Sequence, residues 1–212
     1  MSAEVIPVID IAALVEMELQ SVGEHATRDK SSSSHGADVS AAARSTAARI
    51  DAALKTSGFF YVSNHGVSQS LVDRLWGISK KFFALPEDEK MNIDMKLGGR
   101  AWRGFFPCGG ELTSGVPDHK EGLYFGTDLD PSHPKVVAGV PFHGANQYPK
   151  GVPEMAKMVR EYMERMTTLG HAIMRGLSVA LGLPPSYFKT AMTSDPFTPF
   201  RIFNYPAPVR SV

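Results

Sequence analysis

The sequence predicts an α+β fold, in which an N-terminal region of helices and short strands leads into further strands. The clearest sign is a segment over residues 153–181, where apolar side chains recur at helical spacing until a Gly and two Pro residues follow. Aromatic and β-branched runs at Phe59–Val62 and at residues 200–203 are typical of strands. Residues 92–151 contain many Gly and Pro residues with little periodicity, which predicts long loops with short strands.

Composition limits the class of protein. The 212 residues are 43% hydrophobic and 21% charged, as in an ordinary globular protein. Lys plus Arg and Asp plus Glu both total 22, so no net field would draw the chain to nucleic acid or to anionic lipid, and a small-molecule partner is expected. The single Cys108 excludes an internal disulfide and zinc sites built from several cysteines, which indicates a cytoplasmic setting. Neither a signal peptide nor a membrane-spanning segment is recognisable.

The first forty residues predict a strand, a helix and a loop. Val5–Ile11 is a short β-branched run with a Pro inside it, which favours an edge strand or the entrance of a strand over a central strand. A short helix is expected over Ala12–Leu19. Residues 20–39 are polar and include Ser31–Ser34 in an unbroken row, which predicts a flexible insertion loop.

Two further helices show a buried face. Ser40–Lys55 carries apolar side chains three or four residues apart, at Ala43, Ala47, Ile50 and Leu54. A buried strand at Phe59–Val62 follows, closed by a turn at residues 64–66. The next helix, beginning near Ser68, has one apolar stripe at Leu71, Leu75, Ile78 and Phe82. Pro86 with three following acids then predicts the first turn of another helix.

The long helix over residues 153–181 has the strongest periodicity. The side chains expected on its buried face are Met155, Val159, Tyr162, Met166, Leu169, Ile173, Leu177 and Leu181. Its many Met residues fit core packing better than a promiscuous binding groove.

Segments taken in chain order resemble the isopenicillin-N-synthase-like oxygenases, which include many iron(II)- and 2-oxoglutarate-dependent dioxygenases. They span nearly the whole sequence and read IPVID (6–10), GFFYVSNHG (58–66), FFALPEDEK (82–90), WRGFFP (102–107), DHKE (118–121) and RIFNYP (201–206). Each piece alone is weak, whereas their common order makes the resemblance specific.

The resemblance implies a non-haem dioxygenase N-terminal domain over residues 1–150, with the flexible Ser-rich insertion at about 20–39. Residues 151–212 would supply the long helix and the first strands of a truncated oxygenase barrel. The expected fold is therefore an N-terminal helical and mixed region leading into an incomplete double-stranded β-helix, a jelly-roll, cupin-like core.

The family binds iron(II) through two His and one carboxylate and leaves open positions for 2-oxoglutarate and oxygen. Its His-x-Asp pair lies just beyond the Tyr-Pro segment, and this chain has no His after His171. We therefore expect no metal ligand and no catalytic residue in this chain, and no cofactor bound by it alone. His119 and Glu121 have a possible ligand spacing, but a third ligand is lacking, so local charge pairing in this segment is the favoured interpretation.

The candidate site residues follow from the resemblance. Tyr205, and less strongly Asn204, would reach a carboxylate of the cosubstrate, because a phenol can donate a hydrogen bond to an anion. Simple packing of Tyr205 at a strand end is an equal alternative. Trp102, Arg103 and Phe106 would border the substrate pocket, where an aromatic and cationic lining suits an acidic or planar substrate, although a loop packed on the barrel wall is an alternative.

Two functions remain open at this point. The complete family member would hydroxylate or desaturate a small organic substrate, and this chain would be a truncated form that supplies one wall. Alternatively, the short chain is a non-catalytic binding or interaction module, or a fragment of a gene model. The sequence does not determine the oligomeric state.

Overall fold

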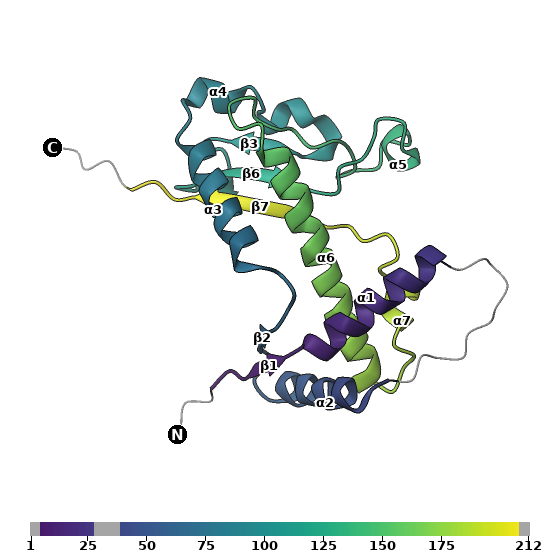
Figure 1. The fold of residues 1–212 in the computed structure, drawn as a ribbon. Coiled ribbons are helices and arrows are strands. Elements are labelled where there is room, and N and C mark those ends of the chain that lie inside the picture. The colour runs from purple at the N-terminus through teal and green to yellow at the C-terminus, as the bar shows by residue number, and fades with distance from the viewer. Residues whose placement is uncertain (1–4, 28–38, 208–212) are drawn as a thin grey trace. The chain divides into compact units, whose positions relative to one another are not determined.

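The computed structural model describes residues 5–27 and 39–207, and the chain divides into two compact units (Figure 1). The first comprises Met1–Ser68 with Glu164–Pro196, and the second comprises Gln69–Met163 with Phe197–Val212. Each unit therefore combines stretches that are far apart in sequence. The division at residue 150 expected from the family resemblance stays a prediction.

The first unit contains a two-stranded parallel sheet and several helices, one of which, α6, is shared with the second unit. Its elements are β1 (Val8–Asp10), α1 (Ala12–Thr27), α2 (Ala41–Lys55), β2 (Tyr61–Ser63), α6 (Met155–Ala180) and α7 (Tyr187–Ala191). Ser40 caps α2, as its side-chain Oγ accepts a hydrogen bond from the Ala43 N–H at 3.1 Å. The buried core consists of Ile9, Ile11, Leu14, Ala43, Ile50, Ala53, Leu169 and Ala172.

The first helix is longer than predicted. It continues past Leu19 to Thr27, into the segment expected to be a loop. The reason is tertiary: Arg175 donates a hydrogen bond to Ser21 Oγ at 2.7 Å and to Glu18 Oε2 at 2.6 Å, which ties the polar part of the helix to α6. The rest of the predicted insertion, residues 28–38 with Ser31–Ser34, lies outside the described residues.

The predicted burial of Phe59–Val62 holds only for Phe60 and Val62, which pack against the core of the first unit. The strand is Tyr61–Ser63, and the side chains of Phe59 and Tyr61 are 70% and 62% exposed. Strand β2 pairs only with β1 among the described strands, so alternate side chains point to solvent. Leu54 is also exposed, because the face of α2 continues from Ile50 to Ala53 instead. The predicted turn is confirmed, with φ of 53° at Asn64 and 77° at Gly66.

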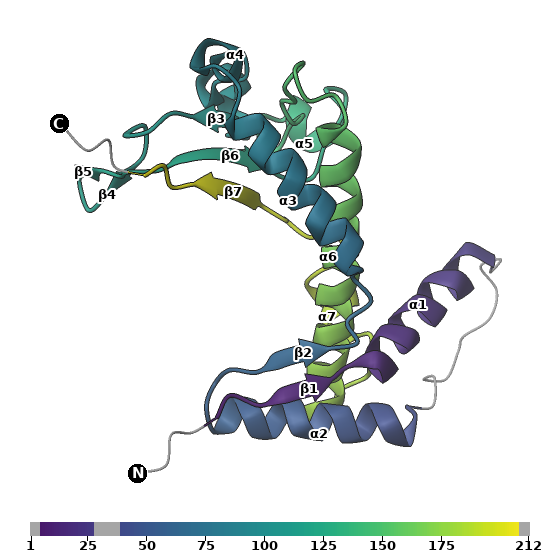
Figure 2. The ribbon, with the colours of Figure 1, turned by 60° about the vertical axis from the view of Figure 1, so that its left-hand side comes forward.

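The second unit is built on a three-stranded antiparallel sheet in the order β3-β6-β7 (Figure 2). Besides residues of α6, the elements of this unit are α3 (Gln69–Phe83), α4 (Glu87–Met91), a 3-10 helix (Met95–Ala101), β3 (Gly104–Phe106), β4 (Leu112–Thr113), β5 (Val116–Pro117), β6 (Glu121–Phe125), α5 (Pro134–Val137) and β7 (Phe200–Asn204). Strand β7 forms one edge, and within residues 39–207 its partner is β6 alone. The expected mixture of helices, loops and short strands is confirmed.

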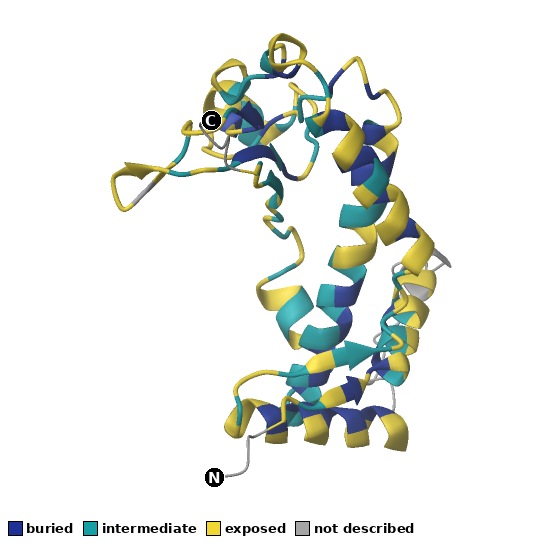
Figure 3. Cartoon of the chain, turned by 90° about the vertical axis from the view of Figure 1, so that its left-hand side faces the viewer, coloured by how far each residue is buried: buried dark blue, intermediate teal, exposed yellow. Residues whose placement is uncertain are grey.

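Helix α3 covers one face of this sheet. The predicted stripe Leu71, Leu75, Ile78 and Phe82 is buried. Figure 3 colours the whole chain by burial, with buried residues in dark blue. The Phe82 ring meets Phe105 of β3 edge to face, with the ring centroids 5.8 Å apart. Because Phe105 pairs with Leu123 of β6 and Leu123 with Ile202 of β7, one row of side chains crosses the sheet under the helix.

Two predicted helix starts differ by a residue or two. Pro86 is the N-cap of α4 and not part of its first turn. Helix α6 begins at Met155. Met155, Val159 and Leu169 of its predicted face are buried, whereas Met166 and Leu181 are 40% and 61% exposed. The long helix itself is confirmed.

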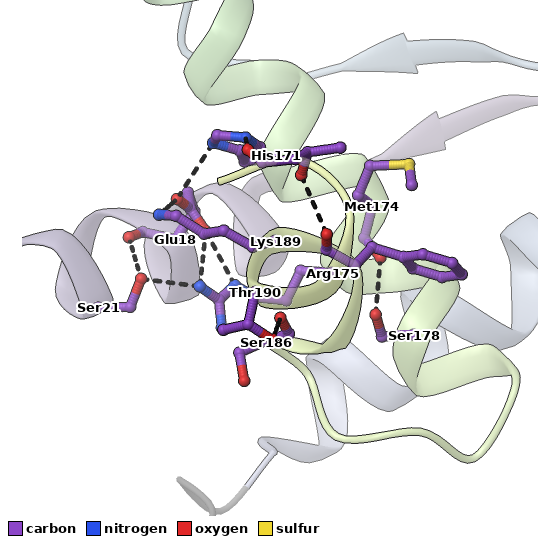
Figure 4. A network of polar contacts seen from close by, with 11 residues as sticks. Glu18, Ser21, His171, Met174, Arg175, Ser178, Ser186, Lys189 and Thr190 are labelled. Atoms are coloured by element: carbon purple, nitrogen blue, oxygen red, sulfur yellow. Dashed lines mark hydrogen bonds and ion pairs between the residues drawn. The ribbon is translucent and has the colours of Figure 1, made fainter. Parts of the chain in front are cut away.

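A buried charge network joins three helices of the first unit (Figure 4). Glu18 of α1 is 1% exposed and accepts hydrogen bonds from Arg175 of α6 and from Lys189 of α7, at 2.6 and 2.5 Å. Burial alone would raise the pKa of Glu18, but the hydrogen bonds from Lys189 and Arg175 hold that pKa below its ordinary value. The carboxylate therefore stays charged and links the helices.

Candidate functional site

The face of the three-stranded sheet that points away from α3 carries aromatic side chains and an arginine. Strand alternation directs Phe106, Tyr124, Arg201 and Phe203 to the face opposite Phe105 and Leu123. The ring centroids of Phe106 and Tyr124 are 5.5 Å apart, and those of Tyr124 and Phe203 are 6.1 Å apart. We call these four residues the aromatic face.

Gly122 leaves the space in which the Phe106 and Phe203 rings of the aromatic face approach each other. It lies in β6 opposite Phe106 on one side and Phe203 on the other. A Cβ atom at this position would collide with the Phe106 ring and would lie 2.8 Å from Phe203 Cδ1. The two rings therefore approach over a position where only glycine fits.

Replacing Gly122 by Ala is expected to destabilise the second unit by about 1–3 kcal/mol, because both rings must move. Gly77→Ala in α3 is the matched control, since a Cβ there meets nothing within 4 Å. It should instead stabilise the protein by about 0.5–1 kcal/mol. Chemical denaturation measures both, and equal effects of one sign would contradict this account of Gly122.

Charged groups join the aromatic face through Tyr124. Arg201 is exposed and its guanidinium carbon lies 5.4 Å from the Tyr124 ring centroid. The Tyr124 hydroxyl donates to Glu111 Oε1 at 2.6 Å, and Lys120 Nζ lies 2.9 Å from Glu111 Oε2. Lys120 also lies 4.8 Å from the Phe203 ring centroid. The face thus presents cations over aromatic rings, which suits a planar or anionic ligand.

Ionisation in this cluster is set by mutual contacts. Burial and the hydrogen bond to Glu111 raise the pKa of Tyr124, so its hydroxyl keeps its proton. The hydrogen bonds from Tyr124 and Lys120 lower the pKa of Glu111. Hydrogen bonds to Asp118 and Glu111 raise the pKa of Lys120, which keeps that ammonium charged.

The structure brings Trp102 and Phe106 together but places Arg103 elsewhere. Both aromatic residues line a pocket of about 320 Å³, together with Met91, Met95 and Lys96. Arg103 is only 3% exposed and donates from Nη2 to the Phe142 carbonyl oxygen at 2.8 Å. A substrate-binding role for these three residues stays a prediction.

The two residues expected near the cosubstrate differ in how accessible their side chains are to a ligand. Asn204 Nδ2 donates to Glu121 Oε1 at 2.8 Å, so that amide is already engaged. Tyr205 is 66% exposed, and its ring centroid lies 6.4 Å from that of Phe203. Tyr205 is therefore the accessible one of the pair, and its role stays a prediction.

The His119 and Glu121 side chains are engaged in structural contacts. His119 Nε2 lies 3.1 Å from the Pro206 carbonyl oxygen, and Glu121 Oε2 pairs with the buried Lys90 at 2.7 Å. Lys120 pairs with Asp118 and Glu111, so the predicted local charge pairing is confirmed. Over residues 5–27 and 39–207, no group of three or more His, Cys, Asp or Glu side chains is placed to hold a metal ion. The described donor set does not fit an iron centre.

Sequence reasoning missed Tyr124 and Arg201. Alternation along residues 121–125 and 200–204 shows which side chains share a face within each strand. Only the register between the two strands shows that Tyr124 and Arg201 lie beside Phe106 and Phe203. The sequence did contain the pattern of alternating side chains, but not the pairing of the two strands.

The comparisons with known proteins identify the family. Residues 6–151 match the family model described as the N-terminal part of "non-haem dioxygenase in morphine synthesis", so the chain belongs to this family of non-haem dioxygenase N-terminal domains. The match confirms the resemblance inferred from the sequence motifs.

Similar proteins point to the same class of enzyme. A probable iron/ascorbate oxidoreductase of Dictyostelium discoideum is 44% identical over 169 residues, which are 76% of this chain and 47% of that protein. A putative 2-oxoglutarate and iron(II) oxygenase structure from Caulobacter crescentus is 26% identical with a TM-score of 0.66, over 77% of this chain and 52% of that one. The structure of a dioxygenase for auxin oxidation in rice has a TM-score of 0.56 at 23% identity, covering 95% of this chain and 52% of that one, which shows a shared fold. The chain spans about half the length of the curated relatives it matches.

Proposed function

We propose that this chain supplies the N-terminal helical region and the first barrel strands of an iron(II)- and 2-oxoglutarate-dependent oxygenase. The complete enzyme hydroxylates or desaturates a small organic substrate. The family match over residues 6–151 carries this proposal, and the relatives named above support it. Because the chain spans about half the length of those relatives, the activity is proposed for the whole enzyme and not for this chain alone.

The aromatic face supports a role as one wall of the substrate site. Arg201 offers an exposed guanidinium beside the rings of Tyr124 and Phe203. Such a surface positions an acidic or planar substrate through charge and ring contacts and keeps water from one side of it. Arg201→Lys keeps the charge but loses the planar fork, so it separates these two contributions.

The cosubstrate contact is assigned to Tyr205. Its exposed hydroxyl is suited to donate a hydrogen bond to a carboxylate of 2-oxoglutarate. Iron, when bound, would supply oxygen activation in enzymes of this class, and the described residues contain no group of three His, Cys, Asp or Glu side chains placed to hold it.

The cellular setting is proposed as cytoplasmic, on the strength of the single cysteine. Among the described helices, none combines the length and the apolar character needed to cross a bilayer.

Anaerobic titration with iron(II) and 2-oxoglutarate tests the assignment, through the weak visible charge-transfer band of the ternary complex. The 212-residue chain alone is expected to give no band while remaining folded by circular dichroism. A chimera in which the segment of this chain that matches the Dictyostelium relative replaces its counterpart there is expected to give one.

Each outcome has a definite meaning. A band with the chain alone would show that it assembles its own iron site, against the proposal. A folded chimera without a band, beside an intact relative that shows one, would favour the non-catalytic binding module instead.

A further inference from the structure

One pocket of the second unit holds two opposite charges that are not paired with each other. Asp94 and Lys96 both line the pocket of about 320 Å³ described above, a volume near the lower limit for small-molecule sites. Asp94 is half-buried and Lys96 is exposed. Within residues 5–27 and 39–207, neither side chain takes part in an ion pair. The pocket therefore offers a carboxylate and an ammonium group to a ligand.

The backbone holds the Asp94 carboxylate in place. Its Oδ1 accepts a hydrogen bond from the Lys96 backbone N–H at 2.8 Å, which caps the 3-10 helix. Among the described residues, the second oxygen, Oδ2, has no hydrogen-bond partner. Because the contact comes from the Lys96 backbone, the side-chain ammonium of Lys96 stays available to a ligand.

The rest of the pocket wall is largely apolar. It includes the thioether side chains of Met91 and Met95 and the rings of Trp102 and Phe106. Met side chains adapt to ligands of irregular shape, and aromatic rings supply a large apolar contact. Among the described residues that line the pocket, only the two named above carry a charge. The wall thus combines one anion, one cation and an apolar remainder.

Trp102 stands at this pocket in an unfavourable backbone conformation. Its φ is 55°, in the left-handed region that bulky residues avoid, although the residue is 52% exposed. The ring is held by its neighbour Phe142, with the ring centroids 5.7 Å apart, and the Phe142 carbonyl oxygen accepts a hydrogen bond from the buried Arg103. Strain that persists at a half-exposed side chain is typical of ligand sites.

A ligand with a single charge fits this wall less well than a zwitterion. A carboxylate alone would meet Lys96 favourably but would also face Asp94, and an amine alone would face Lys96. Each would leave one like-charge contact in the pocket. In an α-amino acid the ammonium and carboxylate groups are attached to one carbon, so such a ligand answers both charges of the wall at once.

We propose that this pocket binds an apolar α-amino acid, with its ammonium group at Asp94 and its carboxylate at Lys96. The ligand's side chain packs on the thioethers of Met91 and Met95 and on the Trp102 ring. This inference rests on the function proposed above for treating the ligand as a substrate, and it names the class of that substrate. The binding itself requires neither iron nor 2-oxoglutarate.

Matched ligands test the proposal on the 212-residue chain. L-Leucine carries both charges, 4-methylpentanoate lacks its ammonium group, and 3-methylbutylamine lacks its carboxylate. Saturation-transfer NMR detects the binding of each ligand. The chain has two Trp residues, so the emission of a Trp76→Phe protein reports on Trp102 alone and places the ligand at the pocket. We expect L-leucine to shift this emission saturably and to bind about tenfold more tightly than either analogue.

Variants that remove one charge assign each end of the ligand. Asp94→Asn keeps an acceptor for the Lys96 N–H, so it should weaken L-leucine binding about three- to tenfold and strengthen 4-methylpentanoate binding. Lys96→Gln should also weaken L-leucine binding, but it should strengthen 3-methylbutylamine binding. A merely structural effect would change the binding of all three ligands in the same direction.

Asp88→Asn and Lys157→Gln are the matched controls, because both residues are exposed, lie in the second unit and do not line the pocket. They should leave the binding of all three ligands unchanged. The proposal is overturned if L-leucine does not bind saturably, if it binds without shifting the Trp102 emission, or if either analogue binds as tightly. It is equally overturned if the Asp94 and Lys96 variants behave like the controls. Because no iron is involved, such a result leaves the proposed oxygenase role to the charge-transfer test of the chimera.

Discussion

Replacing Glu18 by Ala is expected to lower the free energy of unfolding by about 3–5 kcal/mol. The change leaves the Arg175 side chain, which is 8% exposed, buried without its carboxylate partner. Lys189 contributes less, since its side chain is 28% exposed and partly solvated without the ion pair. Urea denaturation followed by circular dichroism measures the loss.

Glu16→Ala provides the control for this experiment. Glu16 lies on the same helix but is exposed, so its replacement should change the free energy of unfolding by no more than about 0.5 kcal/mol. Similar losses in both variants would show that helix propensity, and not the buried ion pair, determines the effect.

The same carboxylate predicts a dependence on pH. Its pKa in the folded state is below the ordinary value of 4.5, so folding favours the charged form. The resulting stability is present above pH 4.5 and is lost as the pH falls through the folded-state pKa. The Glu18→Ala protein should therefore lose less stability than the unchanged protein between neutral pH and that acidic range.

Phe82→Ala is expected to cost about 3–5 kcal/mol, as for other buried aromatic residues. The Phe82 side chain is fully buried, and its ring lies 5.1 Å from that of Phe83 and 5.8 Å from that of Phe105. Its removal leaves a cavity between α3 and the sheet that carries the aromatic face. Chemical denaturation with near-ultraviolet circular dichroism reports both stability and the packing of these rings.

Phe59→Ala is the matched change at an exposed site, where 70% of the residue already meets solvent. We expect a loss of at most about 0.5 kcal/mol there. If Phe82→Ala were equally mild, the contact between α3 and the sheet would not contribute to the stability of the second unit.

The helices could be predicted because their signal is local. The stripe from Leu71 to Phe82 repeats at the helical period, and the structure buries it as expected. The end of α1 could not be predicted in this way, because the polar residues after Leu19 are held by Arg175, whose contact with Glu18 spans 157 positions in the sequence. Local composition favoured a loop, whereas an ion pair with a residue distant in sequence stabilises the helix there.

The candidate site was only partly predictable for the same reason. Trp102 and Phe106 stand in a motif shared with the family, and both line one pocket. Tyr124 and Arg201 are 77 positions apart and become neighbours only through the pairing of β6 with β7. Phe142 belongs to no motif, and its orientation toward Trp102 depends on a left-handed backbone and on a buried guanidinium that no sequence pattern reveals.

The long helix α6 contributes residues to both units. Its residues up to Met163 belong to the second unit, and those from Glu164 onward to the first, where Leu169 and Ala172 complete the core. A shortened chain ending at residue 150 would match the family model almost fully and yet would remove those two side chains from the first unit. In this protein, the segment that matches the family model therefore ends before the residues that complete the core of the first unit.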